Sequence, residues 1–225
     1  MELKTIAHIH TDFPQKFGLP RQSGLIEELT GYIEFEKEYR NPEAVRGMEG
    51  YDYIWLLWGF EVKEDEDFRA TVRPPRLGGN ERMGVFATRS PFRPNHIGLS
   101  SVKLTCVTMT DDRGPLLYVS GIDMRDNTPI YDIKPYLSYT DSHENTRNGF
   151  TDQIMPHELK VDFPKALLDK LPKDKQDGII AVLKNDSRPS YHNNGEEDRI
   201  YGLCYAGYNI RFKVKNDLLN IIEVT

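Results

Sequence analysis

The sequence contains little cysteine and no long apolar run. Cys106 and Cys204 are the two cysteines among 225 residues, and they lie far apart without the CxxC or Cys/His spacing of a metal site. A scaffold held together by disulfides and the usual zinc sites are therefore excluded. The low cysteine content agrees with a protein of a reducing compartment. No run of about 18 apolar residues exists to cross a bilayer, and no apolar signal core follows the first residues. We expect a cytoplasmic protein that does not associate with a membrane.

Positive charge is also in deficit. The chain carries 29 Lys and Arg against 35 Asp and Glu, and its formal net charge is −6. This balance excludes a protein that coats nucleic acid through a general positive field. A local exception lies between Arg69 and Arg93, where six arginines outnumber the single acid Glu81. Because planar guanidinium groups bind carboxylates and phosphates through paired hydrogen bonds, this window predicts an anionic ligand.

Several catalytic signatures are missing as well. The chain has no GxGxxG, GxxxxGK[ST] or GxSxG pattern, so dinucleotide-binding, P-loop and nucleophile-elbow functions lack their anchoring residues. His8 and His10 share one face of a predicted strand, but no carboxylate or cysteine spacing accompanies them. We interpret them as part of an exposed edge strand and expect no metal. Trp55 and Trp58 flank two leucines and are predicted to lie in the core rather than to stack on bases.

Short apolar or alternating segments dominate the first 135 residues and predict strands. A short helix is predicted over residues 41–47, where an Asn cap precedes Pro42 and a glycine ends the segment. Strands without long intervening helices favour an antiparallel barrel or sandwich over a doubly wound sheet. The predicted strands cover residues 5–11, 30–35, 51–60, 84–88, 99–109 and 116–122.

The remainder of the chain predicts a second, smaller unit. Residues 164–168 and 175–183 have helical patterns, and a three-strand meander follows them with a turn at 215–217. The meander strands are predicted at residues 200–205, 209–214 and 218–224. We expect a mainly β protein with one domain at residues 1–137, a linker or excursion at 138–160, and a small α+β domain at 161–225. The first domain is expected to fold when residues from about 150 onward are deleted.

Four stretches contain more proline, glycine and charge than strand formation requires. Proline fixes φ and reduces the entropy that is lost when neighbouring side chains are held for a ligand. Loops on a rigid sheet are where binding sites usually lie, so these stretches are candidate binding loops. They cover residues 16–22, 71–80, 87–98 and 123–136.

The same stretches resemble the TsaA/TrmO-like family of S-adenosylmethionine-dependent tRNA methyltransferases. The matching motifs run in the family's order over about 120 residues. Near-literal matches of this length are highly specific for one family. Residues 186–191 and 205–214 resemble the smaller domain of the longer family members. The motifs are KFGLPRQ (16–22), AVRGMEG (44–50), TVRPPRLGGN (71–80), GVFATRS (84–90), FRPN (92–95) and TP..DIKPY (128–136).

The resemblance implies a single-sheet antiparallel β-barrel with a small α+β C-terminal domain. It also implies a homodimer that binds S-adenosylmethionine and methylates N6 of N6-threonylcarbamoyladenosine beside the tRNA anticodon. Two positions depart from the family. Asn127 stands where the family often has glycine, and this change is mild because asparagine also tolerates a left-handed turn. Glu61 and Val62 stand where the family often has a polar pair, so it stays open whether they contact the cofactor. The implied cofactor contacts are Pro20, Arg21, Gln22, Arg89, Gly98, Leu99, Asp126, Asn127, Thr128 and Pro129.

Methyl transfer to N6 also requires that a proton leave the nitrogen. Asp126 and Asp132 are the hypothetical bases, and the resemblance does not decide between them and a bound water. Arginines of the 69–93 window are predicted to meet the substrate's anionic groups, and residues of the small domain are predicted to grip the anticodon arm. The first group is Arg73, Arg76, Arg82 and Arg93; the second is Arg188, Tyr191, Arg199 and Arg211.

Two other functions stay open. A non-catalytic barrel that binds S-adenosylmethionine or RNA would keep the same loops, and would release no methyl group to tRNA. The hypothesis of a hydrolase that acts on a phosphate ester has less support, because no nucleophile or set of metal ligands accompanies the arginines.

Overall fold

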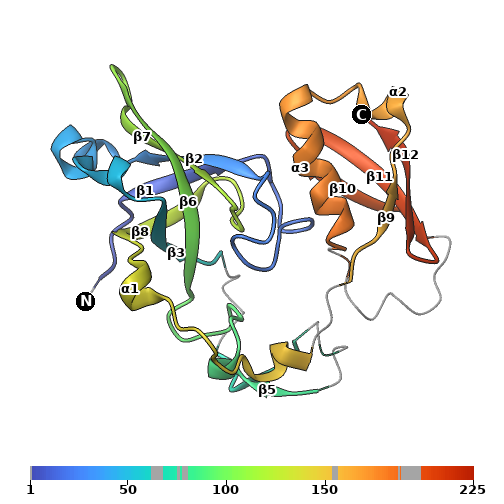
Figure 1. Ribbon diagram of the computed structural model, residues 1–225, viewed down its shortest axis with the longest axis horizontal. Helices are drawn as coiled ribbons and strands as arrows, with labels where there is room; N and C mark the ends of the chain where they lie inside the picture. Colours follow the sequence, from blue (N-terminus) through green and yellow to red (C-terminus); the bar gives the residue numbers. More distant parts are fainter. Residues whose placement is uncertain are drawn as a thin grey trace.

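The structure, a computed structural model, describes residues 2–61, 68–74, 77, 81–153, 157–186, 188 and 199–225. It consists of a β-barrel and a smaller C-terminal unit that lies beside it (Figure 1). Among the helices of these ranges, none is long and apolar enough to cross a membrane.

Six strands form a closed barrel in which every neighbouring pair is antiparallel. The mainly β class and the single-sheet barrel are therefore confirmed. The order around the barrel is β1-β2-β7-β6-β3-β8. The bounds are β1 Ala7–Thr11, β2 Thr30–Phe35, β3 Tyr53–Gly59, β6 Ile97–Thr110, β7 Gly114–Ser120 and β8 Thr128–Pro135.

Alternation along the strands fills the barrel. On β3, Ile54 and Leu56 are fully buried, and their neighbours on either side are more exposed. On β6, Val102 and Leu104 are buried while Lys103 between them is exposed. A period of two places these side chains on one face of each strand, so closing the sheet creates the core.

Strand β1 is an internal strand of the barrel, so the predicted exposed edge is wrong. Ile9 lies opposite Ile33 of β2 and opposite Thr128 of β8, because the sheet closes at this point. His8 Nδ1 lies 2.9 Å from Glu36 Oε1, and His10 Nδ1 lies 3.4 Å from Asp126 Oδ1. Within the described residues there is no group of three His, Cys, Asp or Glu side chains that could hold a metal.

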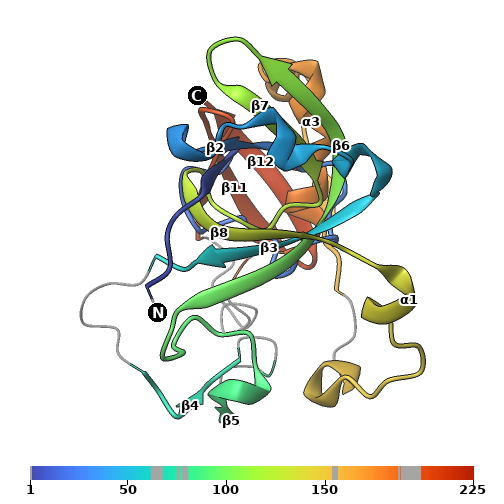
Figure 2. The ribbon, with the colours of Figure 1, turned by 90° about the vertical axis from the view of Figure 1, so that its left-hand side faces the viewer.

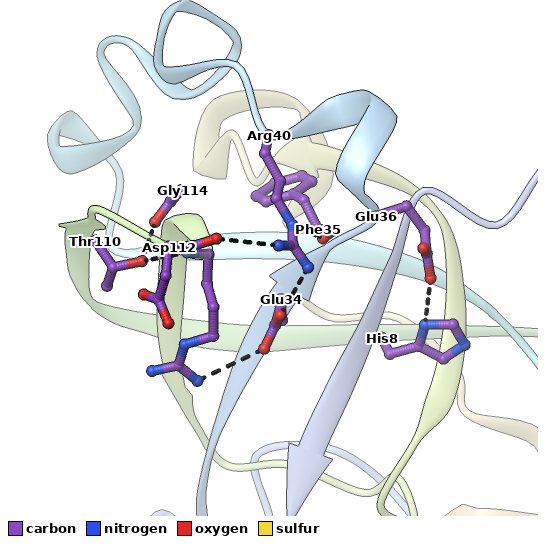
Figure 3. Close-up of polar contacts among 9 residues, drawn as sticks. His8, Glu34, Phe35, Glu36, Arg40, Thr110, Asp112 and Gly114 are labelled. Carbon is purple, nitrogen blue, oxygen red and sulfur yellow. Dashed lines mark hydrogen bonds and ion pairs between the residues drawn. The ribbon is translucent and has the colours of Figure 1, made fainter.

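A polar cluster ties the β6–β7 hairpin to the end of β2 (Figure 3). Arg40 Nε donates to the carbonyl of Phe35 at 2.9 Å, and Nη2 donates to Glu34 Oε1 at 2.8 Å. A third bond of 3.4 Å joins Nη1 to the carbonyl of Asp112 in the hairpin turn. Glu34 also pairs with Arg113 at 3.6 Å. These contacts fix the C-terminal end of β6. The N-terminal end of the same strand lies at the candidate site described below.

Two local predictions in the barrel region are wrong. Residues 84–88 were predicted as a strand, but Val85–Ala87 form the 3-10 helix η5, after the two-residue strands β4 (Thr71–Val72) and β5 (Met83–Gly84). Strand β8 was predicted only as a loop, because its prolines and charged residues mask the strand signal. The predicted helix at 41–47 exists as the 3-10 helix η2, Pro42–Val45, between η1 (Lys37–Tyr39) and η3 (Met48–Gly50).

The C-terminal unit is a four-stranded sheet with helices against it, as Figure 1 shows in orange and red. The predicted meander is confirmed, and its final turn contains Asn216 and Asp217 with φ of 49° and 61°. Strand β9 was not predicted, and it pairs parallel to β12. The bounds are β9 Lys160–Asp162, α2 Lys165–Leu168, α3 Lys173–Lys184, β10 Tyr201–Tyr205, β11 Tyr208–Lys215 and β12 Leu218–Val224. The connection from the barrel to this unit contains α1 (Ser138–Asp141) and η6 (Gly149–Gln153).

The two units share one hydrophobic core through the β1–β2 connection. The rings of Phe13 and Tyr205 lie 5.2 Å apart, and the amide of Ala206 donates to the carbonyl of Asp12 at 2.8 Å. Lys175 Nζ on α3 donates to Asp12 Oδ2 at 2.6 Å. Deleting the C-terminal unit would expose this apolar surface, which argues against a barrel that folds without it.

Candidate functional site

A cavity of about 1370 Å³ opens at the end of the barrel where β3 ends and β6 begins. Its walls come from segments far apart in the sequence: the β1–β2 connection, the β4–β5 region, the loop after η5, the connection before β8, and η6. Figure 2 shows β4 and β5 beneath the barrel. All four predicted binding loops therefore contribute residues to one cavity.

Aromatic side chains form one wall of the cavity. Trp58 and Phe60 line it with ring centroids 4.3 Å apart. A Cβ at Gly98 would lie 2.3 Å from the Trp58 ring, so the absence of a side chain at this position leaves room for the indole. Trp58 belongs to the core as predicted, but it also faces the cavity.

The loop that contains Pro20, Arg21 and Gln22 forms a second wall. Arg89 Nη1 donates to Gln22 Oε1, which joins two of the sequence motifs across the cavity. Arg21 Nη2 donates to the carbonyl of Arg188 at 3.3 Å. One face of the loop therefore meets the cavity, and a contact from the C-terminal unit holds its other side.

Asp123 lines the cavity and lies in the predicted binding loop 123–136, but no sequence signal singled it out as a site residue. Ser100 Oγ donates to Asp123 Oδ1 at 2.7 Å, and Trp58 Nε1 donates to Ser100 Oγ at 3.0 Å. Burial raises the pKa of Asp123 to about 6, while hydrogen bonds and the charge of Arg89 act in the opposite direction. Within that loop, an acidic residue directly after an apolar strand is a pattern too common to mark this carboxylate.

The predicted arginines differ in their surroundings. Arg93 Nη1 donates to the carbonyl of Thr88 at 2.7 Å, and Arg82 Nη1 donates to Thr71 Oγ1 at 3.3 Å, so both brace the walls that they line. Arg73 also lines the cavity and has no hydrogen bond or ion pair to any residue that the structure describes. Arg76 lies outside the described residues.

Several predicted cofactor and catalytic residues lie around the cavity rather than in its wall. Gly98, Leu99 and Thr128 line it, but Asp126, Asn127, Pro129 and Asp132 do not. Asp126 accepts a hydrogen bond from the amide of Thr11 at 3.0 Å. Asn127 has a φ of 61°, which confirms the left-handed turn expected there. Asp132 lies 3.0 Å from Lys134 and faces a second pocket of about 320 Å³.

Residues of the C-terminal unit lie away from the cavity. Arg188 is 8% exposed and binds Asp186 at 2.7 and 2.8 Å, so its guanidinium is held inside the unit. Arg211 lies on the exposed face of β11, 2.9 Å from Glu223. Arg199 lies 5.5 Å from the ring centroid of Tyr201. Tyr191 lies outside the described residues.

Comparison with known proteins gives concordant matches over nearly the whole chain. Residues 8–142 match the tRNA-methyltransferase O N-terminal domain, and residues 156–225 match the TrmO C-terminal domain. The chain is 36% identical over 219 residues to the tRNA (adenine(37)-N6)-methyltransferase of Escherichia coli, covering 95% of this chain and 93% of that protein. It is 34% identical over 227 residues to a protein of Pseudomonas aeruginosa named as an S-adenosylmethionine-dependent methyltransferase, RcsF, covering 97% and 95%.

A solved structure agrees with these matches. The crystal structure of TrmO from P. aeruginosa superposes with a TM-score of 0.79 at 30% identity, covering 100% of this chain and 96% of that chain. Sequence motifs, barrel topology and both domain matches therefore converge. The chain belongs to the tRNA-methyltransferase O family.

Proposed function

We propose that this protein transfers a methyl group from S-adenosylmethionine to N6 of adenosine 37 in tRNA, where that base carries a threonylcarbamoyl group. The observation that carries the proposal is that implied cofactor contacts from separated loops meet in one cavity: Gln22, Arg89, Gly98 and Thr128 all line it. The names of the relatives support tRNA and a methyltransferase activity. Because its proposed substrate is tRNA, we also propose that the protein acts in the cytoplasm.

The cavity fits S-adenosylmethionine in size and chemistry. Its volume of about 1370 Å³ exceeds the roughly 300–1,000 Å³ typical of small-molecule pockets, which leaves room for a nucleobase beside the cofactor. Trp58 and Phe60 offer an apolar wall for the adenine ring, and Gln22 offers amide groups for its edge. Arg89 is exposed at the cavity and would hold the methionyl carboxylate. When bound, S-adenosylmethionine supplies an electrophilic methyl group on its sulfonium.

Arg73 is the residue best placed to recognise the threonyl carboxylate. It lines the cavity, and the described part of the chain offers its guanidinium no partner. Arg82 and Arg93 are already bound to Thr71 and Thr88 and would mainly keep their loops in place. The contact predicted for Arg76 stays a prediction, because this residue lies outside the described part of the chain. A bidentate pair with the carboxylate would distinguish the modified base from plain adenosine.

The outer face of the C-terminal sheet is the proposed contact for the anticodon arm. On β11, Arg211, Lys213 and Lys215 share the face opposite the buried Phe212. This stripe supplies local positive charge despite the net charge of −6. Arg211 and Lys213 would therefore meet phosphates, whereas the buried Arg188 keeps its pair with Asp186.

Exposed aromatic residues near the cavity support the proposed homodimer. Phe86 and Phe68 are 71% and 49% exposed and stack with centroids 6.3 Å apart, and Leu99 at the cavity wall is 53% exposed. Such apolar groups in one region indicate a partner surface, here a second copy of the chain. Light scattering coupled to size exclusion would give the mass of a dimer, and a monomer would contradict this part of the proposal.

Methyl transfer can be tested directly with labelled S-adenosylmethionine. The purified protein is incubated with threonylcarbamoylated tRNA, and a tRNA with guanosine at position 37 is the matched control. We expect label in the first tRNA alone. Binding of S-adenosylmethionine without transfer to either tRNA would favour the non-catalytic barrel.

A further inference from the structure

Two carboxylates line the described part of the cavity, Glu61 and Asp123. The Glu61 side chain is 62% exposed and pairs with Arg125 at 2.8 Å, and its backbone carbonyl accepts a bond from Lys16. It therefore belongs to the rim. Asp123 is largely buried at the cavity wall, where water competes less for its oxygens. Of the two, Asp123 is the better placed to exchange a proton with a bound group.

A chain of hydrogen bonds fixes the orientation of Asp123. Trp58 Nε1 donates to Ser100 Oγ at 3.0 Å, so the hydroxyl is left to donate to Asp123 Oδ1 at 2.7 Å. Ser100 is 1% exposed, which protects this arrangement from exchange with solvent. Ser100 thereby engages Oδ1, and the backbone amides of Ser23 and Asp123 also donate to the carboxylate. Because a carboxylate has about four lone-pair sites, it can still accept a proton.

We propose that Asp123 is the base that accepts the N6 proton during methyl transfer, and that Ser100 is the residue that positions it. This inference rests on the proposed function. The lone pair of N6 forms the new bond to the methyl carbon, and the carbon–sulfur bond breaks with its electron pair left on sulfur. The electrons of the N6–H bond stay on nitrogen, and the proton passes to Asp123.

The surroundings of Asp123 suit this role. Arg89 provides the neighbouring positive charge, Ser100 and the backbone amide of Ser23 provide hydrogen bonds, and burial opposes all three. The result is a pKa of about 6, so the carboxylate is ionised at pH 7 yet more basic than an ordinary aspartate. A base whose pKa lies close to the working pH transfers protons efficiently.

The predicted alternatives have no comparable position. Asp126 is bonded to the amide of Thr11 and paired with His10, and Asp132 faces the second pocket beside Lys134. Neither side chain lines the main cavity. Because a base must come within hydrogen-bond reach of its proton, directly or through one water, geometry favours Asp123.

The test compares Asp123→Asn with Asp177→Asn, a control on the exposed surface of α3. Single-turnover methyl transfer to threonylcarbamoylated tRNA, the Kd for S-adenosylmethionine by calorimetry, and the melting temperature are measured for each. We expect Asp123→Asn to slow transfer by about 10²–10⁴-fold, the usual contribution of general base catalysis. Its Kd should stay within about threefold of the wild type, a change under 1 kcal/mol. The control should match the wild type in all three measurements.

Ser100→Ala supplies a second measurement that does not depend on the folding of Asp123→Asn. The Ser100 bond lowers the pKa of Asp123, so removing it should raise that pKa and move the rise of rate with pH to higher pH. The wild-type rate should rise through about pH 6 and then level off. A pH profile unchanged in Ser100→Ala would overturn the inference, even if Asp123→Asn does not fold.

The outcomes also separate this inference from the proposed function. If the wild type transfers no methyl group, the proposed function fails. If the wild type is active and Asp123→Asn is equally active, Asp123 is not the base. A loss of S-adenosylmethionine affinity in Asp123→Asn that matches its loss of rate would make Asp123 a cofactor ligand and overturn the assignment.

Discussion

Leu203 on β10 joins the C-terminal unit to the loop that contains the predicted cofactor residues. Its side chain is 1% exposed, and a Cβ at Gly18 would lie 2.2 Å from its Cδ1, so the leucine fills the space that the glycine leaves. Gly18 has a φ of 96° and lies two residues before Pro20. The contact therefore braces the cavity wall from behind.

Leu203→Ala should cost stability and cofactor affinity together. Truncating a buried leucine costs about 2–5 kcal/mol, and each kcal/mol lowers the melting temperature of a chain of this size by about 2–4 °C. We expect a fall of about 4–20 °C by calorimetry. Because the loop at Pro20 loses its support, the Kd for S-adenosylmethionine should rise at least about threefold when measured well below the melting transition.

Leu219→Ala is the matched control. Leu219 is also 1% exposed, but it lies on β12 opposite Val161 of β9, away from the strand that contacts the loop. It should lower the melting temperature to a similar extent and leave the Kd unchanged. If Leu203→Ala binds S-adenosylmethionine as tightly as the wild type does, the C-terminal unit does not brace the loop and the reasoning is refuted.

Three arginine substitutions test separate parts of the proposed site. Arg89→Ala should abolish methyl transfer with little change in melting temperature, because the side chain is exposed and bonded to Gln22; retained activity or unfolding would contradict it. Arg73→Glu should remove transfer along with the preference for the threonylcarbamoylated tRNA in paired rate assays. Arg211→Glu should weaken binding of modified and unmodified tRNA alike in filter-binding titrations and reduce the salt dependence, since it loses phosphate contacts.

Much of the fold follows from local sequence patterns. Alternation at Ile54 and Leu56 predicts β3, and the meander around Phe212 has the same signal. Such patterns fail where polar residues occupy a strand, so β8, with a proline near each end, was expected as a loop. They also say nothing of sheet closure, which is why His8 and His10 were expected at an edge.

Loop composition and family motifs locate the site in the sequence, but they do not identify each of its side chains. Gln22 and Arg89 lie in such motifs and meet at the cavity. Asp123 has no motif of its own in the sequence analysis, because its properties come from burial and from Ser100, 23 residues away. The dual position of Trp58, in the core and at the cavity wall, likewise depends on tertiary packing and on the absence of a side chain at Gly98.

Substrate choice tests the proposed methyltransferase most directly. The rate of methyl transfer is measured on one tRNA with and without the threonylcarbamoyl group, and digested nucleosides are analysed by mass spectrometry. Arg73 is exposed in the free protein and would be covered by the bound tRNA. Losing one partner of a charged hydrogen bond buried in this complex costs on the order of 2–5 kcal/mol, and 1.4 kcal/mol corresponds to tenfold in rate. We therefore predict at least about a hundredfold faster methylation of the modified tRNA, with the methyl group on N6 of adenosine 37. Comparable rates on the two tRNAs, or a methyl group at another position, would contradict the proposed reaction.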